Sequence, residues 1–105
     1  MGKKETKTEK AKLYDFRHLR EEVAIGIFAD SDLSKTLANY IYKNTSELFF
    51  VKLALDIHNN GCARIEDNVV DVLVKSIEKS ELKWSVKVAL LGAFGEETPS
   101  INNLK

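Results

Sequence analysis

Apolar side chains recur at intervals of three and four residues along most of the chain, which is the period of an amphipathic helix. A first helix is predicted from Asp15, a favourable N-cap residue, to about Phe28. The apolar positions that define it are Leu13, Phe16, Leu19, Val23 and Ile27. The segment Val23–Phe28 could instead form a short buried strand, because Gly26 weakens the helical interpretation.

Two further helices are predicted in the middle of the chain. One runs from about Leu33 to Asn44, behind a break at 30–32 that offers good N-cap residues. The next begins after 45–46 and ends at Asn59-Asn60-Gly61, where glycine can supply a left-handed C-terminal cap. This third helix is apolar nearly all round, which is typical of helices buried inside a domain or between subunits.

The last two predicted helices complete an all-α fold. Ile65, Val69, Leu73 and Ile77 follow a four-residue spacing, although β-branched residues make a strand over 69–74 the alternative. Ser80 can cap a fifth helix that ends before Gly95. That helix has two apolar sides, one formed by Leu82, Val86 and Ala89 and the other by Trp84, Val88 and Leu91. We therefore expect a compact bundle of about five short helices.

Composition is consistent with one domain. The chain has 105 residues, 44% of them hydrophobic, with five glycines and a single proline, so it can form one core and long regular elements. We expect a disordered basic tail over 1–12, a single helical domain over 13–94 and a disordered polar tail over 95–105.

Charge is distributed unevenly although the formal net charge is zero. Residues 1–12 hold five lysines against two glutamates, whereas residues 13–105 carry 11 basic and 14 acidic groups. Nucleic-acid binding by the body is therefore disfavoured, and only weak binding through the lysine-rich tail is expected. The N-terminus has no apolar run typical of a signal peptide, and no apolar stretch approaches the roughly 20 residues of a membrane span. We expect a cytoplasmic protein without membrane contact.

The residues that could take part in catalysis, metal binding or nucleic-acid binding are better explained by structural roles. His18 and Glu22 are four residues apart, but no further metal-ligand motif accompanies them. His58 and the lone Cys62 lack an identifiable orienting group for nucleophilic catalysis. The glycine pair at 92 and 95 has the spacing of a GxxG loop, yet its interior and flanks lack basic residues, which favours a helix C-terminus. We predict no catalytic, cofactor-binding or metal site, and no small-molecule substrate.

One stretch resembles a group of known proteins. The segment Leu37-Ala-Asn-Tyr-Ile-Tyr-Lys-Asn-Thr45, followed by Ile57-His-Asn-Asn-Gly61 and a helix opening near Glu66, is similar to small helical proteins of bacterial prophages and conjugative elements. The resemblance covers about residues 33–80. It implies an accessory or assembly protein of a mobile element, and it implies no functional residue.

The function expected from these observations is a non-enzymatic protein–protein interaction or assembly module that forms a homodimer. The candidate interface comprises Tyr40, Tyr42, Trp84, Val88 and Leu91, because the third and fifth helices have more apolar surface than one small core can bury. A small nucleic-acid-associated regulator that uses the N-terminal tail is the alternative. An enzyme whose site forms only across subunits is the third.

Overall fold

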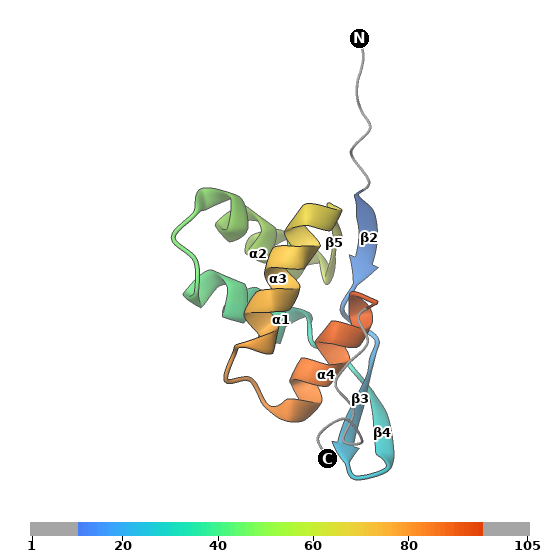
Figure 1. Cartoon of the computed structure of the whole chain (residues 1–105). Helices are drawn as coiled ribbons and strands as arrows, with labels where there is room; N and C mark the ends of the chain where they lie inside the picture. Colours follow the sequence, from blue (N-terminus) through green and yellow to red (C-terminus); the bar gives the residue numbers. More distant parts are fainter. Residues whose placement is uncertain (1–10, 96–105) are drawn as a thin grey trace.

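A computed structural model describes residues 11–95, which form an α+β fold (Figure 1). These residues contain four helices, α1 (Ser34–Lys43), α2 (Leu48–Asn60), α3 (Asp67–Glu78) and α4 (Trp84–Ala93). Their strands are β2 (Lys12–Asp15), β3 (Leu19–Ala24), β4 (Ile27–Ser31) and β5 (Cys62–Ile65). Two antiparallel two-stranded sheets result, β2 with β5 and β3 with β4. The prediction of an all-α bundle of five helices was therefore wrong.

The first predicted helix is in fact the β3–β4 hairpin. Gly26 has φ of 76° in the turn, a left-handed conformation that favours glycine and breaks a helix. Val23, Ile25 and Ile27 surround it with β-branched side chains, which favour extended backbone. The alternative of a short buried strand over Val23–Phe28 was also wrong, because the segment spans the turn and its residues are exposed.

Strand β5 was not anticipated. Ile65, assigned to the fourth helix, instead pairs with Lys12 at one end of the β2–β5 ladder, and Cys62 pairs with Asp15 at the other. Lys12, assigned to the N-terminal tail, is thus part of the fold. Ala11 and Gly95 of the predicted tails are also described, whereas residues 1–10 and 96–105 lie outside the described residues.

The other helices were predicted well. Residues 34–43 and 48–60 are helical, and Gly61 caps α2 with φ of 74°, as expected. The α3 helix confirms the helical interpretation of 69–74 over the strand alternative. Ser80 has a different role from the one predicted: its hydroxyl donates to the carbonyl of Ile77 at the end of α3, and α4 begins only at Trp84.

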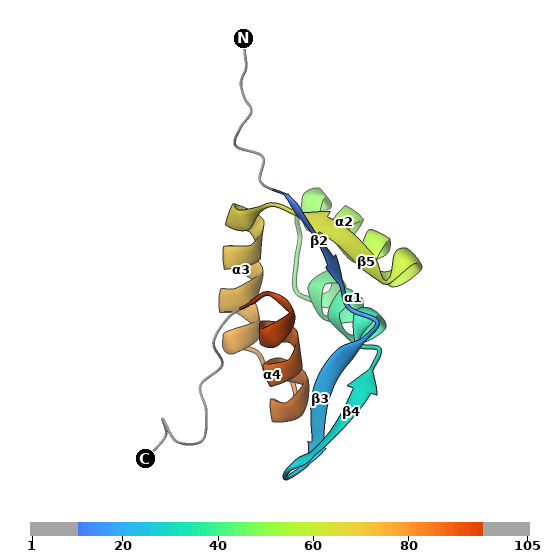
Figure 2. The same cartoon turned by 90° about the vertical axis from the view of Figure 1, so that its right-hand side faces the viewer.

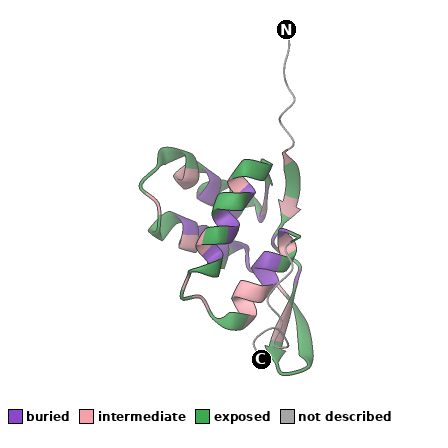
Figure 3. Ribbon diagram, viewed as in Figure 1, coloured by how far each residue is buried: buried purple, intermediate pink, exposed green. Residues whose placement is uncertain are grey.

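One core joins the helices to both sheets. Helix α1 packs against α2, and α4 packs against α3 on one side and β3 on the other (Figure 2). The fully buried side chains include Phe16, Leu37, Ile57, Ile77 and Leu90. Figure 3 shows buried positions gathered mainly on the helices, whereas the β3–β4 hairpin extends away from them and is largely exposed.

Phe16, between β2 and β3, connects three distant segments. Its N–H donates to the carbonyl of Gly61, and its own carbonyl accepts from the N–H of Leu33, each at 2.9 Å. Its ring is fully buried and packs against Tyr14 and Phe94. Phe16 thereby holds the base of the β3–β4 hairpin against the end of α2 and the segment before α1.

Candidate interaction surfaces

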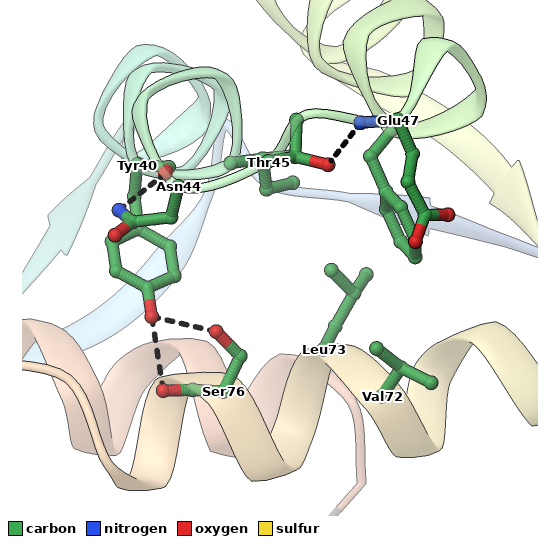
Figure 4. Close-up of a pocket in the computed structure, with 9 residues that line it drawn as sticks. Tyr40, Asn44, Thr45, Glu47, Val72, Leu73 and Ser76 are labelled. Carbon is green, nitrogen blue, oxygen red and sulfur yellow. Dashed lines mark hydrogen bonds between the residues drawn. The ribbon is translucent and has the colours of Figure 1, made fainter.

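The Tyr40 side chain forms hydrogen bonds within the protein itself. Its hydroxyl donates to the carbonyl oxygen of Ser76 at 3.0 Å and lies 2.6 Å from the Ser76 hydroxyl (Figure 4). This contact fastens α1 to α3, and the ring is half-buried. We therefore remove Tyr40 from the candidate interface, because pairing with another subunit would have to compete with these bonds.

A pocket lies beside Tyr40, between the end of α1, the start of α2 and the middle of α3 (Figure 4). Asn44 and Thr45 at its rim are engaged locally: the Asn44 amide donates to the Tyr40 carbonyl, and the Thr45 hydroxyl accepts from the N–H of Glu47. Its volume is about 200 Å³, below the roughly 300–1,000 Å³ typical of small-molecule sites. The pocket is therefore a poor candidate for substrate binding.

Tyr42, two residues further along α1, is exposed and lines a different hollow. This groove of about 240 Å³ runs between α1 and α2, with Ala38 and Ala54 among its lining residues and Leu55 and His58 on the α2 side. Two alanines allow the helices to approach closely there. Tyr42 thus remains a candidate contact residue, with no hydroxyl bond among the described residues.

Helix α2 has a second apolar side that points away from the core. Leu53 and Ile57 face the core and are buried. Leu48, Val51 and Leu55 follow a spacing of three and four residues on the opposite side, with Leu48 and Leu55 exposed and Val51 half-buried. Together with the neighbouring Tyr42, these three residues form what we call the α1–α2 outer surface.

The three candidate interface residues of α4 differ in how far they are buried. Leu91 is only 1% exposed and belongs to the core, so it is not available to a partner. Trp84 is exposed and Val88 half-buried, and both line a hollow of about 170 Å³ against α3. Leu91 was placed in the interface because the helix spacing groups it with Trp84 and Val88, but α4 is packed against both α3 and β3.

His18 does not pair with Glu22, although their spacing allowed it. His18 lies before β3, with its Nδ1 3.2 Å from the Asp30 carboxylate, and both groups are exposed. The Glu22 carboxylate instead accepts the N–H of Gly26 in the hairpin turn. Among residues 11–95, no group of three or more histidine, cysteine or acidic side chains could hold a metal ion. The glycine pair follows the helical interpretation, since α4 ends at Ala93 and Gly95 has φ of 79°.

Within residues 11–95, the ion pair between Asp15 and Arg17 was missed by sequence reasoning. Asp15 accepts three hydrogen bonds from Arg17: one from its backbone N–H and two from its guanidinium, each at 2.9 Å. These bonds hold the pKa of the Asp15 carboxyl well below its ordinary value and raise the pKa of Arg17. Asp15 and Arg17 are two residues apart at the end of β2, a spacing that allows the two side chains to pair. This pairing was not considered because a helix had been predicted there.

Similarity to known proteins offers no assignment. No family model, curated protein or solved structure matches the chain. In the described residues, no helix is long and apolar enough to cross a membrane.

Proposed function

We propose that the protein is a non-enzymatic interaction module that self-associates as a dimer through the α1–α2 outer surface. The observation that supports this most directly is the second apolar side of α2. A monomer would leave Leu48 and Leu55 exposed to water, with Leu55 beside Tyr42 in the α1–α2 groove, and exposed apolar patches are typical of protein–protein contacts.

The spacing on α2 suits helix pairing. Leu48, Val51 and Leu55 occupy alternating a and d positions of a heptad, so that the α2 helices of two copies can pack along a common seam. Burying such a seam at about 25 cal/mol per Å² of apolar surface offsets part of the association cost. The proposal retains the expected dimer and Tyr42, and replaces Tyr40 and the α4 residues of the expected interface with residues of α2.

Charge favours a parallel arrangement of the two helices. Glu47 and Lys52 are exposed and flank the seam five residues apart, the separation at which opposite charges pair across parallel coiled helices. Glu47 would then face Lys52 of the partner subunit. An antiparallel arrangement would bring the two lysines of the dimer together instead.

The first test compares two exposed aliphatic residues. Leu55 is 50% exposed on the proposed interface, and Val72 on α3 is 52% exposed outside it. Light scattering at micromolar concentration should report about twice the 11.9 kDa chain mass for the wild type and for Val72→Glu. Leu55→Glu should give the monomer mass with unchanged circular dichroism. A monomeric wild type, or equal effects of both substitutions, would reject the proposal.

The second test addresses helix orientation. Lys52→Glu should weaken dimerisation by placing two acidic residues opposite each other, and Glu47→Lys added to it should restore the dimer. Sedimentation equilibrium of both variants measures this. Restoration supports the parallel arrangement, whereas a further loss in the double variant would argue against it.

A further inference from the structure

The β3–β4 hairpin carries a second exposed apolar surface, separate from the α1–α2 outer surface. Strand β3 lies between α4 and β4 in both views, so the outer edge of β4 is directed away from the body (Figures 1 and 2). Within residues 11–95, the backbone of β4 is bonded to β3 alone. Its outer edge therefore presents a row of free N–H and C=O groups.

The one charged residue of strand β4 is Asp30, so its edge is protected against a second acidic strand but not against a basic one. The strand contains no lysine, no proline and no bulge, since the irregularity of the ladder lies in β3 between Glu22 and Ala24. Ile27 and Phe28, on opposite faces, are 59% and 47% exposed. Such an edge is a template for a further strand, because backbone bonding supplies affinity and alternate side chains supply specificity.

The two faces of the hairpin differ in chemistry. One face carries the cross-strand pairs Arg20–Asp30 and Glu22–Phe28, with the Arg20 guanidinium 4.0 Å from the Phe28 ring centre. A shallow hollow of about 280 Å³ lies on this face, lined by both of these residues and Asp30.

The other face carries Glu21–Ala29 and Ala24–Ile27. The Glu21 carboxylate there accepts a bond from the Ser85 hydroxyl of α4 at 2.8 Å. Along β4 this face carries Ile27, Ala29 and Ser31. A strand added to the edge would therefore lie beside Phe28 and the Asp30 carboxylate on one side and beside Ile27 and Ala29 on the other.

Charge indicates what the added strand should carry. Residues 19–32 hold a single arginine against four carboxylates, Glu21, Glu22, Asp30 and Asp32. Pairing of two β4 edges would bring acidic hairpins together, which is unfavourable. We propose that β4 accepts an extended segment of another protein in which basic and apolar residues alternate. Its basic side chains would lie beside Asp30, and its apolar ones beside Ile27.

The test uses two synthetic eight-residue peptides of equal composition. One alternates lysine and valine, and the other has four lysines followed by four valines. Titration of the full-length, isotope-labelled protein should shift the amide signals of residues 27–31 saturably with the alternating peptide. The block peptide should bind about tenfold more weakly, because it cannot place both residue types on their matching faces.

Charge reversal provides the matched control. Asp30→Lys should weaken binding of the alternating peptide about tenfold, whereas Asp56→Lys, the same charge change on α2, should leave it nearly unchanged. Ile27→Lys tests the apolar face and should also weaken binding. Equal binding of both peptides, equal effects of both aspartate substitutions, or no saturable shift at 27–31 would overturn the proposal. A shift of these signals with protein concentration alone would show instead that β4 pairs with a second copy.

Discussion

The aliphatic part of Arg17 lies over Gly61, in the space that a β-carbon on that glycine would occupy. Gly61 also has φ of 74°, which disfavours any residue with a side chain. Asp15 holds Arg17 in place through the guanidinium. Position 61 therefore requires glycine for two independent reasons, one conformational and one steric.

Gly61→Ala should destabilise the protein more than Gly26→Ala. Gly26 has nearly the same φ but open space around it, so its replacement should cost only the conformational penalty, roughly 1–2 kcal/mol. Gly61→Ala must in addition displace Arg17. Urea denaturation measures both, and in an Arg17→Ala background the two costs should become similar. Equal costs in the wild-type background would contradict the steric part.

Acid sensitivity should depend on Asp15. Because its pKa is lowered in the folded state, the carboxylate contributes stability above the ordinary pKa of 3.8, and this contribution is lost as the pH falls below that value. The free energy of unfolding should therefore decrease less steeply between pH 4 and pH 2 for Asp15→Asn than for the wild type. A residual slope should remain, since the Ser34 hydroxyl and N–H also lower the pKa of Asp32. Identical slopes would show that the pairing with Arg17 is not formed in solution.

Substitutions of the two tyrosines of α1 should have different effects, one on stability and the other on dimerisation. Tyr40→Phe removes the hydroxyl bonded to Ser76 and should cost about 0.5–1.5 kcal/mol of stability, with the dimer retained. Tyr42→Ala should leave stability nearly unchanged and weaken the dimer. Thermal denaturation and light scattering of the two variants check this. The reverse pattern would place Tyr40 at the interface after all.

Leu91→Ala should act on the core. The side chain is buried between α4 and its neighbours, so truncation should cost about 2–5 kcal/mol. Trp84→Ala, at an exposed position on the same helix, should cost less. Chemical denaturation curves of the two variants provide the comparison. A stable Leu91→Ala monomer would instead indicate a role in association.

Helix positions were predictable where the signal was local. The cap at Gly61 and the apolar period of residues 69–77 both lie within or next to the helices they define. Strand β5 could not be predicted in this way, because its four residues pair with β2, far away in sequence. The hairpin was missed because Leu19, Val23 and Ile27 happen to follow a helical spacing; Gly26 among β-branched residues was the available counter-signal.

The candidate site was predictable only in part. The all-round apolar character of residues 48–57 indicated a second apolar side of α2, and the structure has one. Which tyrosine joins it could not be inferred, because Tyr40 and Tyr42 differ only in whether Ser76 lies opposite. The same holds for Leu91, whose burial depends on how α4 packs against α3 and β3.

Phe16 also has a consequence for hydrogen exchange. Its amide is bonded to Gly61 and its carbonyl to the amide of Leu33, so neither amide becomes free through fraying of a single element. The Phe16 amide should exchange with solvent only when its segment separates from residue 61, and the Leu33 amide only when it separates from Phe16. Amides at the tip of the β3–β4 hairpin should exchange much earlier. We therefore expect the segments joined at residue 16 to be among the last parts of the described fold to open, well after the hairpin tip.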